Sequence, residues 1–339
     1  MENTQKRLKL NDFLLNYSLY IVLGALILVV IIMEPSFISL QNITNILGQA
    51  STRIIMALGA AGLIILKGTD LSAGRILGLC AVVASSLAQS TTYASRMYPN
   101  LPALPLILPL LAAIGVGLIF GAINGFGVAK LKVHAFIITL GTQLIAYGLS
   151  CIYIDRPPNG AQPIGSLDVR YTSLVRNTVD IGPVKLPYVI FYAVIISVIM
   201  WFVWNKTKLG KNMYAIGGNT EAAEVSGVNI VKNIMFIFII SGVLYGIAGF
   251  LEAARIGSTT SNTGLNYDLD AISASVIGGV SFSGGVGTIP GVIMGAVILQ
   301  FINYGLTFVG VSPYLQYIIK GLIIILAVSI DVRKYIVKK

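Results

Sequence analysis

The residues of this sequence that could do chemistry are polar side chains set within long apolar runs. Gln300, Asn303 and Tyr304 are separated by three positions and then one, so they share one face of a helix. Amides, hydroxyls and aromatic rings are the groups that bind sugars, and polar groups in apolar segments face protein or water to limit their free-energy cost. We predict that this face lines a substrate pathway, with packing at a dimer seam as the alternative. Asn124 and Gln143 are predicted instead to form hydrogen bonds between helices.

Two glycine-rich elements resemble each other. Residues 68–74 read G-T-D-L-S-A-G, and residues 278–288 read G-G-V-S-F-S-G-G-V-G-T. Helix interruptions at corresponding places in two halves of a transporter point to its substrate pathway, and irregular backbone at membrane depth needs protein or water beside it. Asp70, Ser72 and Ser283 are therefore candidate pathway or gate residues. In the alternative interpretation the elements are tight turns, and Ser72 and Ser283 cap the helices that follow.

Ionisable side chains also lie within the apolar runs. Glu252 and Arg255 are spaced i, i+3 and are predicted to neutralise each other. A proton relay is the alternative, but a relay carboxylate needs an accessible neutral form, and an adjacent arginine favours the charged form. Lys320 lies well inside the last apolar run, where we expect it to snorkel or to pair with a carboxylate such as Asp268 or Asp270.

Motifs for catalysis and metal binding are absent from the sequence. It contains no G-x-x-x-x-G-K-[ST] phosphate-binding motif, because Lys211 of its Gly-Lys pair is followed by Asn212. A single histidine, His134, excludes a multi-histidine metal site and a Ser-His-Asp arrangement is not present. We therefore predict no catalytic residue, no metal site and no enzyme activity, and a transporter or channel is the expected class.

The composition defines the environment of these residues. Of 339 residues, 56% are hydrophobic and 11% are charged, and the mean hydropathy is +0.85. Because a soluble domain carries about 25% charged residues, the apolar surface of this chain must face lipid. This excludes a cytosolic enzyme, a disordered chain and a nucleic-acid-binding protein. The net charge of the chain is +10, and in membrane proteins such an excess of Lys and Arg is typical of the cytoplasmic loops.

The apolar runs predict an all-α polytopic membrane protein with about ten transmembrane helices, since a span needs roughly 20 mostly apolar residues. The predicted segments are 17–33, 46–66, 72–89, 104–128, 135–154, 188–204, 234–255, 269–280, 288–309 and 313–330. The eighth segment is short and runs into glycines. Basic residues near both ends and in the loops on the same side place both termini in the cytoplasm. Residues 1–339 then form a single transmembrane domain, with a cytoplasmic loop at 205–233 and an external loop at 155–187.

The cytoplasmic loop contains a predicted short helix. Asn219 or Thr220 can cap it, Glu221 in its first turn complements the helix dipole, and Gly227 can end it in the left-handed conformation. Its small-residue face would suit docking onto another protein, and a solvated connecting helix is the alternative. The candidate docking residues are Asn219, Thr220, Glu221, Ala222, Ala223, Ser226 and Gly227.

Three runs of residues resemble one family of membrane transporters. Residues 217–228 match G-x-N-x-E-A-A-x-x-S-G-V, residues 68–74 match G-x-D-L-S-x-G, and residues 278–288 match a second glycine-rich element. Together they resemble the permeases of ABC importers in the ribose and monosaccharide family, which is branched-chain amino acid/ribose permease-like. The similarity covers nearly the whole chain. Residues 69–75, 303–306 and 316–321 look closest to the galactose/methyl-galactoside permeases.

The resemblance implies a division of labour among several proteins. Two copies of the chain would form an importer-type permease in a bacterial inner membrane, an extracytoplasmic binding protein would deliver the sugar, and a cytoplasmic ABC ATPase would hold ATP and Mg²⁺. The chain itself then needs no cofactor, and its short cytoplasmic helix would receive the closure of the ATPase. Galactose or a methyl-galactoside is the implied substrate. Ribose, another monosaccharide or a nucleoside is the alternative within the family, and an ATP-independent carrier or channel is the alternative class.

Overall fold

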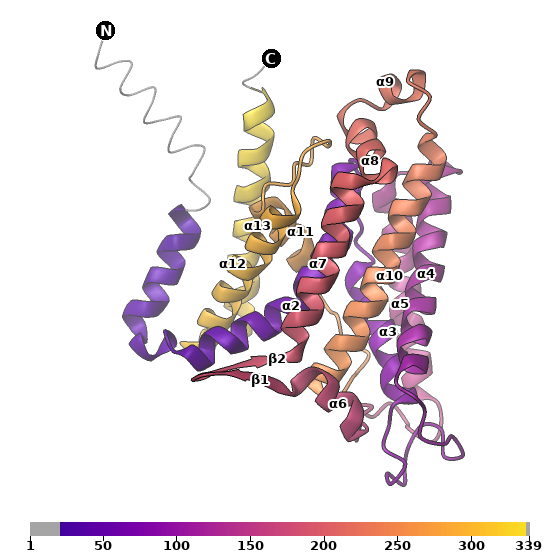
Figure 1. The fold of residues 1–339 in the computed structure, drawn as a ribbon, viewed down its shortest axis with the longest axis vertical. Helices are drawn as coiled ribbons and strands as arrows, with labels where there is room; N and C mark the ends of the chain where they lie inside the picture. The colour runs from indigo at the N-terminus through magenta and orange to yellow at the C-terminus, as the bar shows by residue number, and fades with distance from the viewer. Residues whose placement is uncertain (1–20, 337–339) are drawn as a thin grey trace.

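The computed structural model describes residues 21–336, which form a bundle of helices running roughly along one axis (Figure 1). The helices are Ile21–Met33, α2 (Leu40–Ile65), α3 (Ala73–Leu87), α4 (Ile107–Ala129), α5 (Ala135–Asp155), α6 (Val169–Arg176), α7 (Tyr188–Lys206), α8 (Lys208–Gly218), α9 (Thr220–Val225), α10 (Ile230–Ile256), α11 (Tyr267–Ile277), α12 (Ile289–Phe308) and α13 (Pro313–Ile336), with a 3-10 turn at Pro35–Phe37. The predicted helical fold is confirmed, and it carries one short hairpin that was not predicted. A short antiparallel hairpin joins β1 (Thr178–Ile181) and β2 (Val184–Pro187), with Val179 opposite Leu186.

Each of the ten predicted segments coincides with a helix, although the start of the first segment lies outside the described residues. Within residues 21–336, seven helices are long and apolar enough to cross a membrane, namely α2, α4, α5, α7, α10, α12 and the first 18 residues of α13. The other two complete segments are short. α3 has 15 residues and α11 has 11, lengths of about 22 and 16 Å at 1.5 Å per residue. Since the hydrocarbon core is about 30 Å thick, neither helix crosses it alone.

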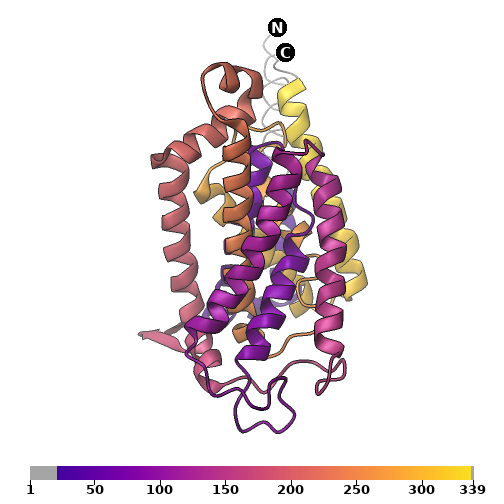
Figure 2. The same cartoon turned by 90° about the vertical axis from the view of Figure 1, so that its right-hand side faces the viewer.

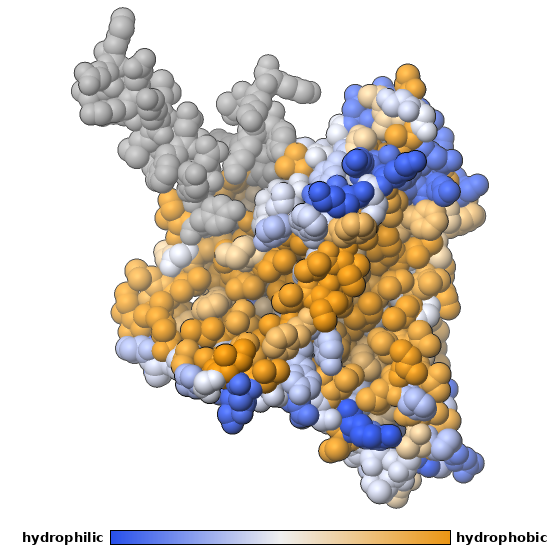
Figure 3. Space-filling model, in the orientation of Figure 1, coloured by the Kyte–Doolittle hydropathy of each residue, from blue (hydrophilic) through white to orange (hydrophobic). Residues whose placement is uncertain are grey.

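The two long loops lie at opposite ends of the bundle. α8, α9 and the end of α13 lie at one end, here called the α9 end, and α6 and the hairpin lie at the other, here called the α6 end (Figure 1). Figure 3 shows a broad apolar band between polar surfaces at both ends. This arrangement fits a membrane-embedded body in which the predicted loops 155–187 and 205–233 emerge on opposite faces. The terminal basic residues of the topology prediction lie outside the described residues or have no described side chains.

The centre of the bundle is built around α2 and α10. In their most apolar 18 residues, 89% of the positions in α2 and 61% of those in α10 are buried, against 28% in α5 and 11% in α13. α4 packs closely on α10, because a Cβ at Gly117 would lie 2.1 Å from the carbonyl oxygen of Gly242. Small residues allow such approach of helix backbones in membranes. The outer helices leave most of their apolar surface for lipid or for another protein.

Candidate functional site

The short helix α9 forms as the local residues predict. Asn219, and not Thr220, is the N-cap, and its side-chain oxygen accepts a hydrogen bond from the Ala222 N–H at 3.0 Å. Gly227 has φ +82°, and the next N–H, of Val228, donates to the carbonyl of Ala223 at 3.0 Å. These bonds satisfy orphan backbone groups at both ends of a helix that is only six residues long. α9 therefore forms a well-defined projection beyond the ends of the bundle helices (Figure 1).

The exposed surface of α9 differs from the predicted docking face in one residue. Ala223 has a side chain that is 4% exposed and packs inward, because it lies on the face of α9 turned toward the bundle. Glu221, Ala222 and Ser226 are exposed as predicted. Val225, which is 90% exposed at the end of α9, was not among the predicted docking residues. An apolar residue between polar neighbours in a polar loop is the signal that could have found it.

The second glycine-rich element meets the end of α2 at the base of α9. The Gly285 N–H donates to the carbonyl of Ile65 at 2.9 Å, which joins the second element to the end of α2, just before the first element. Gly217, near the end of α8, lies against the same two groups, since a Cβ there would be 1.9 Å from the Ile65 oxygen and 2.6 Å from the Gly285 nitrogen. Lys67 adds a long contact from its Nζ to the carbonyl of Gly218, at 3.5 Å. We call this contact of residues 65–67, 217–218 and 284–285 the glycine junction.

α8 holds a second point of contact with the same element. The hydroxyl of Tyr214 donates to the carbonyl of Gly287 at 2.9 Å. Burial raises the pKa of Tyr214 to about 12, so the hydroxyl keeps its proton and stays a donor. The loop that carries α9 is thus bonded to the segment that links α11 and α12.

The first glycine-rich element places its polar groups inside the protein. Asp70 and Ser72 are 3% and 0% exposed. The Asp70 carboxylate accepts hydrogen bonds from the N–H and hydroxyl of Ser72, and the side-chain amide of Asn124 donates to the Ser72 hydroxyl at 2.9 Å. Thr142 donates to the Asn124 oxygen at 2.7 Å, so the network joins the start of α3 to α4 and α5. The interhelical role predicted for Asn124 is confirmed.

The capping roles predicted for the two serines are wrong. Ser72 occupies the N-cap position of α3 but makes no side-chain capping bond, because its hydroxyl is engaged with Asp70 and Asn124. Thr288, and not Ser283, caps α12 by accepting from the Gly291 N–H at 3.2 Å. Ser283 lies five residues earlier in an exposed turn, where its N–H donates to the Ser281 hydroxyl at 3.1 Å.

The face shared by Gln300, Asn303 and Tyr304 packs against α2. The Gln300 amide donates to the Gln49 side-chain oxygen at 2.9 Å, and the Tyr304 hydroxyl donates to the Asn42 side-chain oxygen at 3.0 Å. Asn303 differs from its two neighbours, since its side-chain oxygen is buried and has no hydrogen-bond partner among the described residues. This face of α12 therefore lies in a polar contact with α2.

An ionic network, which the sequence analysis found only in part, crosses the centre of the bundle. Asp270 on α11 accepts from Lys320 at 2.9 Å and from Arg53 at 2.5 Å. Of the two partners expected for Lys320, Asp270 is therefore the one that binds it. The Arg53 guanidinium carbon lies 3.3 Å from the centroid of the Tyr267 ring. Arg53 was not predicted to bind Asp270, although an arginine inside the apolar run of α2 indicates a buried acidic partner.

The same network continues to the pair predicted on α10. The Glu252 side chain is 0% exposed and accepts two hydrogen bonds from Arg255, each 2.8 Å long. The hydroxyls of Thr52 and Tyr267 each donate to Glu252 at 2.8 Å. The Glu252–Arg255 pair is therefore confirmed as a neutralised pair, and it stabilises the contact of α2, α10 and α11.

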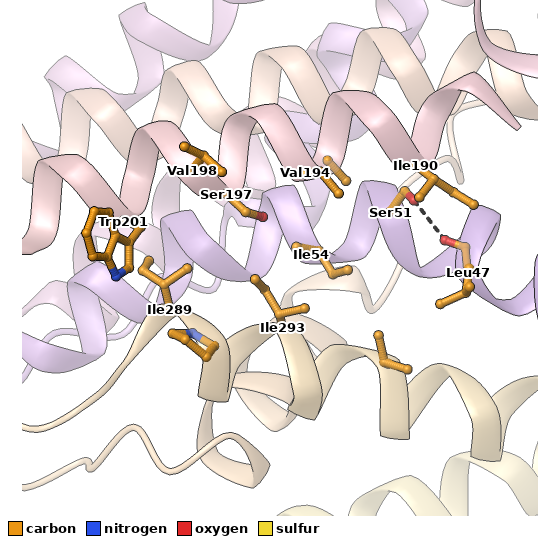
Figure 4. A pocket seen from close by; sticks show the side chains of 13 residues that line it. Leu47, Ser51, Ile54, Ile190, Val194, Ser197, Val198, Trp201, Ile289 and Ile293 are labelled. Atoms are coloured by element: carbon orange, nitrogen blue, oxygen red, sulfur yellow. Dashed lines mark hydrogen bonds between the residues drawn. The ribbon is translucent and has the colours of Figure 1, made fainter. Parts of the chain in front are cut away.

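A groove between α2, α7 and α12 has the wrong chemistry for a sugar. It has a volume of about 370 Å³ and is lined by apolar side chains, among them Ile54, Trp201 and Ile293 (Figure 4). The Ser51 hydroxyl in its wall already donates to the carbonyl of Leu47 at 2.7 Å. Such a surface suits lipid, and a polar pathway must lie elsewhere.

Comparison with known proteins decides the class of this membrane protein. The family described as "Branched-chain amino acid transport system / permease component" matches residues 42–328. The chain belongs to this permease family. It is 51% identical over 322 residues to the galactose/methyl galactoside import permease MglC of Escherichia coli K12 and to that of Salmonella typhimurium LT2, with 95% of each chain covered. It is 35% identical over 323 residues to the ribose import permease RbsC of E. coli K12, again with 95% of each chain covered.

No solved structure matches the permease. Its family makes it a transport component of an import system and not an enzyme, and a multi-pass protein of the inner membrane. The resemblance read from the three sequence motifs is confirmed by this match. The roles of individual residues in coupling and in the pathway stay predictions.

Proposed function

We propose that this permease is the membrane subunit of an ATP-driven ABC importer for galactose or a methyl-galactoside. The observation that carries the proposal is the 51% identity to permeases named for galactose and methyl galactoside import, against 35% to the ribose import permease. Both comparisons cover 95% of this chain. Both identities are therefore measured over nearly the whole permease.

The projection of α9 supports docking of a cytoplasmic ATPase. Glu221, Ala222 and Ser226 form a small, partly acidic surface, and Val225 adds an apolar tip that is 90% exposed. An exposed apolar residue surrounded by polar residues is typical of a surface that binds another protein. ATP and Mg²⁺ belong to that partner, and the permease contributes no cofactor site of its own.

The exposed outer helices support a second copy of the permease. α13 and α5 bury only 11% and 28% of their most apolar windows, which leaves surface for a homodimer as well as for lipid. An extracytoplasmic binding protein delivers the sugar at the α6 end, and the two copies alternate their access as the ATPase closes. Selectivity resides in the delivering protein, so the pathway needs only weak contacts, for which Asn303 and Ser283 are candidates.

Reconstitution tests this proposal directly. Proteoliposomes containing the permease, its ATPase and its sugar-binding protein are expected to take up labelled galactose only when ATP and the binding protein are both present. Val225→Glu is expected to lower uptake at least tenfold, because a charge on the apolar tip opposes docking. Leu131→Glu is the control, since Leu131 is also an exposed apolar residue (59% exposed) but lies in the connection between α4 and α5 and not in the loop that carries α9. Galactose counterflow by the purified permease alone, or uptake of ribose in place of galactose, would contradict the proposal.

A further inference from the structure

The connection between α10 and α11 enters the body of the protein. It begins at the α6 end, where Thr259 and Ile164 exchange two backbone hydrogen bonds of 2.8 and 3.0 Å. It then runs along α3 in backbone contact. A Cβ at Gly78 would lie 2.1 Å from the carbonyl oxygen of Thr263, and one at Gly74 would lie 2.4 Å from that of Gly264. The two glycines of α3 are required by this close approach.

The depth of the connection follows from the length of α3. α3 ends at Leu87, and the chain just beyond it bonds to the α6 end, because the Asp168 N–H donates to the carbonyl of Ala88 at 2.8 Å. Gly78 and Gly74 precede Leu87 by nine and 13 residues, or about 14 and 20 Å of helix at 1.5 Å per residue. In a hydrocarbon core about 30 Å thick, the connection therefore reaches the middle of the membrane, where the half-length helix α11 begins.

This connection is polar along almost its entire length. Residues 258–266 read S-T-T-S-N-T-G-L-N, with hydroxyl or amide side chains at seven of nine positions. Asn262 is exposed, and Ser261 and Thr263 beside it are half-buried. Irregular backbone and polar side chains are tolerated at this depth only where they face protein or line a water-filled cavity. The exposed part of the connection must therefore face water or a second copy of the permease, and not lipid.

A cation and an aromatic ring stand beside the connection. Arg75, in the first turn of α3, donates from Nη1 to the carbonyl of Ser261 at 3.1 Å. Its guanidinium carbon lies 4.3 Å from the centroid of the Tyr147 ring. Tyr147 is 37% exposed on α5, and it lies eight residues, or about 12 Å of helix, before the end of α5 at Asp155. These helices form the side of the bundle that faces the viewer in Figure 2.

We infer that Arg75, Tyr147, Ser261, Asn262 and Thr263 form a monosaccharide contact site in the outer half of the translocation pathway. Guanidinium, amide and hydroxyl groups supply donors and acceptors for sugar hydroxyls, and the face of an aromatic ring packs against the C–H side of a sugar ring. The polar side chains of this set keep exposed surface, which a passing sugar needs. The inference rests on the proposed function for the identity of the ligand, but its claim of a water-lined surface at this depth does not.

Cysteine accessibility tests the water-lined surface without any sugar. In a Cys151→Ser background, with the fully buried Cys80 kept, Asn262→Cys and Tyr147→Cys are expected to react with a charged methanethiosulfonate at least tenfold faster than Ile145→Cys. Ile145 is the matched control, because it is 55% exposed on α5 but lies two residues from Tyr147 and thus on another face of the helix. Equal rates at the three positions would overturn the inference.

Sugar uptake tests the contact itself. Asn262→Ala and Arg75→Gln are expected to lower galactose uptake at least fivefold in the reconstituted importer, while ATPase activity stimulated by the binding protein stays at the wild-type level. Arg75→Lys, which keeps the charge, is expected to restore part of the uptake. Wild-type uptake by both Asn262→Ala and Arg75→Gln would refute the contact site. Failure of the wild-type importer to move galactose, with the labelling pattern intact, would instead refute the proposed substrate.

Discussion

Replacing Gly217 by alanine places a methyl group inside the glycine junction. The added Cβ would lie 1.9 Å from the carbonyl oxygen of Ile65 and 2.6 Å from the nitrogen of Gly285. Both are backbone atoms, so neither can rotate away as a flexible side chain would. The Gly285 N–H···O bond to Ile65, 2.9 Å long, has to lengthen or break to make room. We therefore expect Gly217→Ala to separate α8 from the end of α2.

The size of the effect follows from three terms. Overpacking in a well-packed site costs about 1–3 kcal/mol, and loss of the hydrogen bond costs about 1 kcal/mol more. Alanine is favoured over glycine within a helix by about 0.5–1 kcal/mol, which offsets the second term. The net expectation is a loss of about 1–3 kcal/mol of stability at Gly217. Gly218 is the matched control, because a Cβ there meets nothing within 4 Å, and Gly218→Ala is expected to be neutral or to stabilise by up to about 1 kcal/mol.

Two measurements separate local packing from coupling. The thermal unfolding midpoint of the purified permease is expected to fall for Gly217→Ala and to stay within a degree of wild type for Gly218→Ala. In proteoliposomes, Gly217→Ala is expected to lower sugar uptake per ATP hydrolysed, because the exposed surface of α9 still binds the ATPase while its link to α2 is weakened. The same midpoint and the same uptake per ATP for both variants would refute the role assigned to the glycine junction.

Three further changes test other parts of the structure. Asp270→Asn leaves the cations of Arg53 and Lys320 without their shared carboxylate, and it is expected to lower the free energy of unfolding by about 3 kcal/mol. Lys320→Met keeps the Arg53–Asp270 pair and is expected to cost less. An equal loss of stability in both variants would contradict this prediction. Asn219→Ala removes the α9 cap, worth about 1 kcal/mol, and should weaken ATPase binding in a pull-down without changing the unfolding midpoint, whereas Asn219→Ser should bind normally. Tyr214→Phe deletes a hydrogen bond worth about 1 kcal/mol and should lower uptake per ATP; unchanged coupling would show that this bond transmits nothing.

Local rules predicted the helices and the caps, since these depend on residues close together in the chain. The position of each apolar run, an N-cap at Asn219 or Thr220 and the left-handed Gly227 follow from the sequence, and the structure selects Asn219 as the cap. The burial of Ala223 does not, because it depends on how α9 sits on the bundle. The same holds for Ser72, whose hydroxyl is taken by Asn124 from 52 residues away and so cannot cap α3.

Ionic partners were harder to predict, because the charges that meet are far apart in sequence. Arg53 is 217 residues from Asp270, and Thr52 is 200 residues from Glu252. Only the Glu252–Arg255 pair, one turn apart on a single helix, could be read from spacing. The depth of the connection 257–266 was also missed, since its polar composition equally describes an ordinary external loop. Its contact with Gly74 and Gly78 shows that it runs along α3 into the body of the protein.

Polar groups at membrane depth in this permease fall into two kinds, and the difference locates the pathway. Those of the first kind, such as Asp70, Asn124 and Glu252, are fully buried and already hydrogen-bonded between helices. A sugar could reach them only by breaking those bonds, and an unpaired buried polar group costs about 1–3 kcal/mol. Groups of the second kind, such as Asn262 and Tyr147, keep exposed surface. A weak and rapidly released substrate requires contacts of the second kind, which is why we propose that the surface between α3, α5 and the polar connection forms part of the pathway. In this proposal the buried networks hold that surface in shape.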